Sequence, residues 1–149
     1  MNLKTAVIGV GSMGRNHARV YWDLPDVRLV WVADKNAAVV RGIAKRYNTH
    51  PYTDFRRLLD EQQPDVVTIA VTTNSHLDIA LEVIQRGIHV LIEKPIASTA
   101  EEARAIIDAA RKTNVQLMVG HIERFNPADL PPIFVPVLML DMAHKSAVE

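Results

Sequence analysis

The sequence predicts an α/β fold in which six parallel strands form a doubly wound sheet with helices on both faces. Short apolar runs rich in β-branched residues alternate with longer segments of helical periodicity along residues 5–119. The composition agrees, because 48% hydrophobic and 23% charged side chains among 149 residues suit one globular domain with a sizeable core. Strands that alternate with helices form parallel sheets with right-handed crossovers, so we expect the strand order 3-2-1-4-5-6.

The first half of the chain divides into three strands, each followed by a helix. Asn36 is a suitable cap for the second helix, because its side chain can accept hydrogen bonds from the free N–H groups of the first turn. The expected strands span residues 5–9, 27–33 and 50–53, and the expected helices span residues 12–21, 36–47 and 54–61.

The second half repeats this alternation. Gly87 is a good helix stop, and Ser98 with Glu101 fits a capping box at the start of an Ala-rich helix. The expected strands span residues 66–71, 88–92 and 115–119, and the expected helices span residues 75–86 and 98–112.

Charge and composition argue against several classes of function. The 17 basic and 17 acidic side chains cancel, so no overall field favours nucleic acid or a membrane surface as a partner. The chain has no cysteine for disulfides or thiolate zinc sites, and its histidines lack metal-ligand spacing. With no signal peptide and no long apolar run, we expect a cytoplasmic protein without a metal site.

Glycines after the first strand predict a site for a dinucleotide. Gly9, Gly11 and Gly14 open a helix, with Ser12 and Met13 between them. In this pattern the first glycine permits a tight turn, the second lets the backbone approach a pyrophosphate, and the third lets the helix pack closely on the strand. The helix N-terminus adds free N–H groups and a partial positive charge. We therefore expect a Rossmann domain, with a glycine turn that binds no ligand as the alternative.

An acidic residue at the end of the second strand indicates which dinucleotide is bound. Asp34 lies about twenty positions after Gly14, where a carboxylate accepts hydrogen bonds from ribose hydroxyls and repels a 2′-phosphate. This favours NAD as the cofactor over NADP, although the adjacent Lys35 would tolerate a phosphate. The alternative role for Asp34 is to cap the following helix.

The end of the fourth strand places further candidate cofactor contacts at the same edge of the sheet. These are Val71, Thr72, Thr73 and His76, and for any single residue of this run helix capping is an equally good explanation.

Charged residues follow the fifth and sixth strands. The Lys94 ammonium can lie beside the nicotinamide, with Glu93 next to it, and donate a hydrogen bond to a substrate oxygen; a solvated ion pair of the two is the simpler interpretation. His121 and Arg124 can contact the substrate or serve only as hinge residues. For His17 we favour a solvated helix face.

Taken in order, these motifs resemble the glucose–fructose oxidoreductase / inositol dehydrogenase family over residues 3–128. Glu93-Lys94-Pro95 is the most specific motif, and residues 120–127 look most like sugar-nucleotide dehydrogenases. Thr72 stands where proline is frequent in the family, which should alter the stiffness of the loop. The matching residues are Gly9, Gly11, Gly14, Arg15, Asn16, His17, Asp34, Asp65, Val66, Val67, Thr72, Thr73, His76, Glu93, Lys94, Pro95, Arg124, Phe125, Asn126 and Pro127.

The resemblance implies an NAD(P)-dependent oxidoreductase that acts on a sugar, sugar nucleotide or cyclitol. The family transfers a hydride between a carbinol carbon and nicotinamide C4. Lys94 matches its catalytic lysine, which orients the reacting oxygen and assists proton transfer.

The resemblance also bears on the C-terminal part of the chain. Family members continue into a substrate domain whose catalytic histidine lies in an Asp-x-x-x-His motif. Here Asp141 and His144 are one residue too close together, and we interpret them as a coincidence. We expect residues 1–125 to form the NAD(P)-binding domain and residues 126–149 to be a truncated remnant or tail of a substrate domain that is largely missing.

Two further hypotheses follow for a chain of this length. The chain alone can bind NAD without catalysis, because the substrate has to be held close to the nicotinamide. Alternatively, the proline-rich apolar residues 131–140 dock on a partner or on a second copy, giving a homo-oligomer, or they fold back over the sheet edge.

Overall fold

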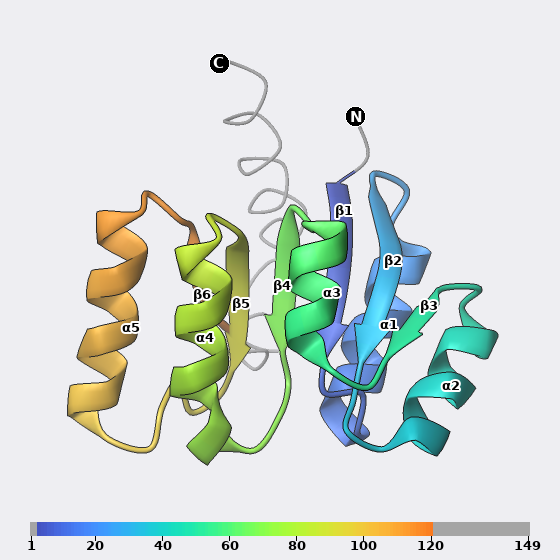
Figure 1. Ribbon diagram of the computed structural model, residues 1–149, viewed down its shortest axis with the longest axis horizontal. Coiled ribbons are helices and arrows are strands. Elements are labelled where there is room, and N and C mark those ends of the chain that lie inside the picture. Colours follow the sequence, from blue (N-terminus) through green and yellow to red (C-terminus); the bar gives the residue numbers. More distant parts are fainter. Residues whose placement is uncertain (1–2, 121–149) are drawn as a thin grey trace, which may run out of the picture. The chain divides into compact units, whose positions relative to one another are not determined.

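The computed structural model describes residues 3–120 of the chain. Its six strands form one sheet in the order β3-β2-β1-β4-β5-β6, which confirms the predicted order (Figure 1). The registered pairs from β3 to β5 are all parallel. The strands are β1 (Leu3–Ile8), β2 (Val27–Ala33), β3 (His50–Tyr52), β4 (Val66–Ile69), β5 (His89–Glu93) and β6 (Leu117–Gly120).

Helices connect the strands and cover both faces of the sheet. In Figure 1, α3, α4 and α5 lie on the near face of the sheet, and α1 lies behind β1 and β2. No helix between residues 3 and 120 is long and apolar enough to cross a membrane. The helices are α1 (Ser12–Asp23), α2 (Ala37–Arg46), α3 (Phe55–Gln62), α4 (His76–Gln85) and α5 (Ala100–Lys112), with a 3-10 turn η1 (Thr73–Ser75) before α4.

The central strands are buried because helices pack on both faces of the sheet. All four residues of β4 are buried, and the hydroxyl of its Thr68 is satisfied by the Tyr21 hydroxyl of α1 at 2.6 Å. On the other side of the sheet, Leu58 of α3 and Ile84 of α4 are fully buried. This packing fixes the carboxyl ends of β1, β4 and β5 relative to one another.

Local signals for the ends of two helices are confirmed. The Asn36 side chain accepts hydrogen bonds from the N–H groups of Ala38 and Val39, at 3.0 and 3.2 Å, so it caps α2 as expected. Gly87 has a φ of 72° just beyond α4, a conformation that glycine adopts without strain and that ends the helix.

The capping box expected at Ser98 and Glu101 is wrong by one residue. Thr99 is the cap of α5, and its hydroxyl accepts from the N–H of Glu102 at 3.2 Å. In return, the Glu102 carboxylate accepts from the N–H of Ser98 at 2.9 Å. Both positions offer a hydroxyl followed three residues later by Glu, so the sequence alone did not distinguish them.

The segment between β4 and α4 also differs from the expectation. The strand ends at Ile69 instead of residue 71, and the helix begins at His76 after the turn η1. Ser75 is at the N-cap position of α4, and its side chain makes no capping hydrogen bond. This irregular backbone leaves Val71 and Thr72 free to line a cavity instead of continuing the strand.

Several expectations lie outside the described residues and stay predictions. These are the domain boundary at residues 125 and 126, the substrate contacts of His121 and Arg124, the coincidence of Asp141 and His144, and the docking of residues 131–140.

Candidate cofactor site

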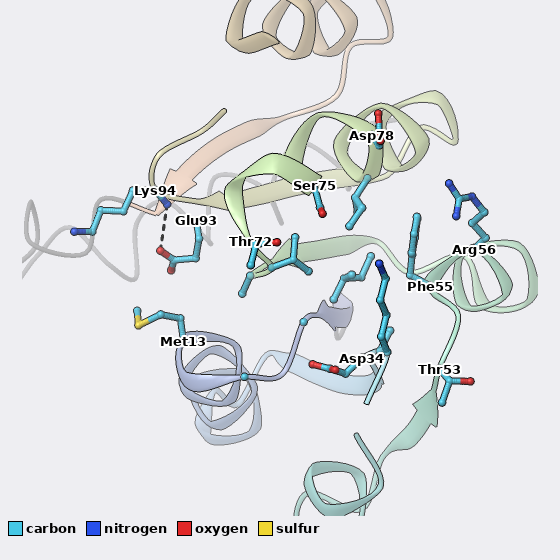
Figure 2. Close-up of a pocket in the computed structure, with 18 residues that line it drawn as sticks. Met13, Asp34, Thr53, Phe55, Arg56, Thr72, Ser75, Asp78, Glu93 and Lys94 are labelled. Carbon is cyan, nitrogen blue, oxygen red and sulfur yellow. Dashed lines mark hydrogen bonds between the residues drawn. The ribbon is translucent and has the colours of Figure 1, made fainter. Parts of the chain in front are cut away.

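An open cavity of about 620 Å³ lies at the carboxyl ends of β1, β2, β4 and β5 (Figure 2). Glu93, Lys94 and Met13 stand at one end of the cavity, and Thr53 and Arg56 stand at the opposite end. This is the edge of the sheet at which the sequence places the ligand. The cavity is lined by these candidate residues from the sequence: Gly9, Gly11, Met13, Asp34, Lys35, Val71, Thr72, Glu93 and Lys94.

Gly9 and Gly14 are required by the packing of the chain itself. Gly9 has a φ of 84°, and a Cβ atom there would lie 2.6 Å from the carbonyl oxygen of Ala70. A Cβ atom on Gly14 would overlap the carbonyl oxygen of Gly9. The tight turn at Gly9 and the close helix packing at Gly14 are therefore as expected.

Gly11 differs from its two neighbours, because a Cβ atom added to it would meet no protein atom within 4 Å. The protein's own packing therefore does not explain a glycine here. Gly11 is the N-cap of α1, and no side chain caps the free N–H groups of that helix. Open space beside a helix N-terminus suits an anion such as a pyrophosphate.

Asp34 is tied to the glycine loop. Its Oδ2 accepts from the N–H of Val10 at 2.9 Å, and its Oδ1 accepts from the N–H of Asn36 at 2.8 Å. The alternative in which Asp34 caps α2 is wrong, because the cap is Asn36. Each carboxylate oxygen can accept more than one hydrogen bond, so Asp34 retains acceptor capacity for ribose hydroxyls at the cavity.

Glu93 is buried, with an exposed fraction of 6%. Its Oε1 lies 2.6 Å from Nε2 of His17 on α1, and its Oε2 accepts from the N–H of Lys94 at 3.2 Å. The solvated ion pair is therefore wrong for Glu93, and the solvated helix face is wrong for His17. These two residues are 76 positions apart, so no local pattern could have paired them.

Lys94 follows Glu93 and is exposed at the cavity. Figure 2 shows its side chain leaving the strand end beside Glu93. A flexible ammonium with three donors at the edge of a cavity can reach a bound oxygen atom.

His76 was expected to contact the cofactor, but it does not line the cavity. Its side chain is buried, with 1% exposure, and its ring nitrogens lie next to backbone carbonyl oxygens of Val71 and Pro95. Thr73, in the turn η1, and Ser12, the first residue of α1, are also not among the lining residues.

The far end of the cavity was missed by the sequence reasoning. Thr53, Phe55 and Arg56 line it from the end of β3 and the first turn of α3. The guanidinium of Arg56 lies 4.7 Å from the centre of the Phe55 ring, and its Nε donates to Glu82 at 2.8 Å. The signal was available, because β3 ends at the same edge of the sheet as β1 and β4.

Residues 3–120 contain no cluster of three or more His, Cys, Asp or Glu side chains that could hold a metal ion. The charged residues that line the cavity have both signs. Asp34, Asp78 and Glu93 are acidic, and Lys35, Arg56 and Lys94 are basic. Such a lining suits an elongated polar ligand that carries its own charged and neutral parts.

A family described as an oxidoreductase family with an NAD-binding Rossmann fold matches residues 3–121. Among curated relatives, the UDP-N-acetylglucosamine 3-dehydrogenase of Acidithiobacillus ferrooxidans is 37% identical, over 86% of this chain and 40% of its own length. The D-glucoside 3-dehydrogenase of Escherichia coli is 34% identical, over 83% of this chain and 36% of its own length. The chain thus spans about two fifths of the length of these relatives.

Solved structures are also similar to this chain. An NAD-binding oxidoreductase from Klebsiella pneumoniae is 33% identical, with a TM-score of 0.79, and the match covers 87% of this chain and 37% of the other. GenD2 from gentamicin A biosynthesis, solved in complex with NAD, is 34% identical, with a TM-score of 0.77, over 80% of this chain and 34% of the other.

Proposed function

The chain belongs to the oxidoreductase family with an NAD-binding Rossmann fold, and we propose that it is the cofactor domain of a dehydrogenase of sugars or sugar nucleotides. The observation that carries the proposal is the single cavity that brings Gly11, Asp34 and Lys94 together. The names of the relatives, which are dehydrogenases of a sugar nucleotide and a glucoside, support the substrate class.

The residues present fit NAD along the length of the cavity. The open space over Gly11 and the N-terminus of α1 suit the pyrophosphate. Asp34 suits the hydroxyls of the adenosine ribose, and the Phe55 end of the cavity offers an apolar ring beside them. The opposite end, at Glu93 and Lys94, is then the nicotinamide end.

In the proposed reaction, NAD held at Gly11 and Asp34 would supply the hydride acceptor for the oxidation of a substrate alcohol to a carbonyl. Lys94 donates a hydrogen bond to the reacting oxygen and assists removal of its proton. Glu93, buried and held by His17, fixes the backbone from which Lys94 extends. Other residues, predicted at His121 and Arg124, would contact the substrate.

A second candidate is a binding module that holds NAD without catalysing a reaction by itself. It is supported by the cavity, whose described lining includes the residues expected to bind the dinucleotide. Turnover of any sugar by the isolated chain would contradict this candidate. For either candidate we propose a cytoplasmic location, where NAD and sugar nucleotides are available.

A matched pair of glycine substitutions tests the binding of NAD. Gly11→Ala and Gly42→Ala both introduce a Cβ atom that meets no protein atom within 4 Å, but only Gly11 lies at the cavity. We expect NADH, followed by its fluorescence, to bind wild type and Gly42→Ala equally and to bind Gly11→Ala at least about tenfold more weakly, a loss of roughly 1.4 kcal/mol. Equal binding by all three chains would contradict the site.

A test of the catalytic role of Lys94 needs a protein that also binds the substrate. A chimera can join residues 3–120 of this chain to the remainder of the UDP-N-acetylglucosamine 3-dehydrogenase from Acidithiobacillus ferrooxidans, with which it shares this domain. We expect Lys94→Ala in the chimera to lower kcat by about two orders of magnitude or more, the usual size of a general acid–base contribution. Lys112→Ala, which changes an exposed lysine at the end of α5 that does not line the cavity, is the control. Full activity of Lys94→Ala would exclude the role.

A further inference from the structure

His76 is a buried titratable residue that the proposed chemistry does not use. It opens α4, and its side chain is 1% exposed. Both ring nitrogens lie within hydrogen-bond distance of backbone carbonyl oxygens. Nε2 lies 3.1 Å from the oxygen of Val71, and Nδ1 lies 3.0 Å from that of Pro95 and 3.3 Å from that of Ile96.

The two groups of carbonyls belong to different segments at the carboxyl edge of the sheet. Val71 follows β4 and lines the cavity, whereas Pro95 and Ile96 directly follow Lys94 at the end of β5. Carbonyl oxygens only accept hydrogen bonds, so the imidazole ring is the donor wherever it bonds to them. A neutral ring carries one N–H and so donates to one side in each tautomer, but the buried ring lies between the end of β4 and the segment that follows Lys94, within hydrogen-bond distance of both.

The segment around Lys94 is also held on its other side. The Glu93 carboxylate, directly before Lys94, bonds to His17 of α1. In Figure 1, α1 and α4 lie on opposite faces of the sheet. The backbone of Lys94 is thus anchored before it by α1, through Glu93, and after it by α4, through His76.

We propose that His76 is a positioning residue, whose ring holds the segment after β5 against the end of β4 and so sets where Lys94 stands along the cavity. The inference rests on the proposed function, in which Lys94 stands at the nicotinamide end. In this inference His76 acts by holding the backbone near Lys94 and Val71, and it does not contact the cofactor or the substrate.

Three substitutions separate the two sides of the ring. His76→Phe keeps an aromatic ring and removes both ring nitrogens. The amide nitrogen of Asn takes the place of Nδ1, so His76→Asn keeps a donor toward Pro95. Gln is longer and places its amide nitrogen near Nε2, so His76→Gln keeps a donor toward Val71. The control is Tyr21→Phe, which removes a buried hydrogen bond to Thr68 of β4 away from the cavity.

The main readout is the acetylation of Lys94 by a soluble acylating reagent, measured by mass spectrometry on the full chain with and without saturating NADH. We expect NADH to slow acetylation of Lys94 in wild type and in Tyr21→Phe. In His76→Phe and His76→Gln this protection should fall at least about threefold, the effect of losing one buried hydrogen bond, while His76→Asn should retain most of it. Equal protection in wild type and His76→Phe overturns the proposal, as does an equal loss in Tyr21→Phe.

Hydrogen exchange separates this inference from the proposed function. We expect the amides of residues 96–98 to exchange faster in His76→Phe than in wild type and Tyr21→Phe, with no cofactor present. If NADH binds wild type without protecting Lys94, the proposed function of Lys94 fails, and unchanged exchange at residues 96–98 would overturn the positioning role separately. If His76→Phe does not fold, the comparison of His76→Asn with His76→Gln is the test. Equal protection of Lys94 by NADH in these two variants overturns the proposal.

Discussion

At the scale of single residues, we expect the carboxylate of Asp34 to govern the choice of dinucleotide. It is held by the N–H groups of Val10 and Asn36, so its charge is fixed at the edge of the glycine loop. We expect wild type to bind NADH more tightly than NADPH, because the carboxylate repels a 2′-phosphate. Asp34→Asn should narrow that preference by about tenfold or more. Fluorescence titration with both cofactors checks this, and tighter binding of NADPH by wild type would contradict it.

A second residue links protonation to stability. His89 of β5 accepts a hydrogen bond on its Nδ1 from the N–H of Gln116 at 3.1 Å, which requires the nitrogen to be unprotonated. Burial lowers the pKa of His89 below its usual 6.5, an effect that the charge of Asp65 partly opposes. The unfolded chain therefore takes up this proton at a higher pH than the folded chain. Stability is lost as pH falls from about 6.5 to the lower pKa of His89 in the folded chain.

His89→Asn removes this titration and keeps an acceptor for the N–H of Gln116. We expect the unfolding free energy of wild type, from urea titrations between pH 8 and pH 5, to fall more steeply toward low pH than that of His89→Asn. Parallel curves for the two chains would show that His89 does not carry this dependence.

Residue identities in the site were only partly predictable from the sequence. Gly9, Gly14 and Asp34 follow from the spacing of the strand–turn–helix pattern, although Gly9 meets Ala70 and Asp34 meets Val10, which are distant in the chain. The partners of His17 and His76 depend on contacts between separate elements, which periodicity does not report. The contact of Glu93 with His17 of α1 likewise joins separate elements and does not depend on its neighbours in the chain.

At the scale of elements, the type and order of strands and helices were predictable, and their ends were less so. Apolar β-branched runs such as β2 are buried on both faces and carry a strong signal. The end of β4 is set instead by the approach of Gly9 to Ala70, a tertiary contact. The start of α5 was ambiguous because two hydroxyl residues precede it.

That ambiguity gives a test at the start of α5. Thr99→Ala removes the hydroxyl that accepts from the N–H of Glu102, and it should cost about 1 kcal/mol of unfolding free energy. Ser98→Ala should change stability by less than about 0.5 kcal/mol, because the backbone N–H of Ser98, and not its hydroxyl, meets Glu102. Urea denaturation of both variants measures the difference. A larger loss of unfolding free energy in Ser98→Ala than in Thr99→Ala would show that Ser98, the position expected from the sequence, is the cap.

For the whole molecule, the same cavity couples cofactor binding to folding. A ligand that binds only the folded chain adds stability by mass action, about 2.7 kcal/mol when its free concentration is one hundred times Kd. The cavity is built from the ends of β1, β2, β4 and β5, which are distant in the chain and come together only on folding. The unfolded chain therefore lacks the site, and NADH should stabilise the folded state as a unit.

We accordingly expect saturating NADH to raise the Tm of the chain by roughly 5 to 10 °C, as scaled from the unfolding entropy of a domain of this size. Calorimetry over a series of NADH concentrations measures the shift, which should grow with concentration. Gly11→Ala should show the unliganded Tm of wild type but little shift, since its new Cβ occupies open space and touches no protein atom. A wild-type Tm that does not respond to NADH would contradict cofactor binding by this chain, whatever the relatives bind.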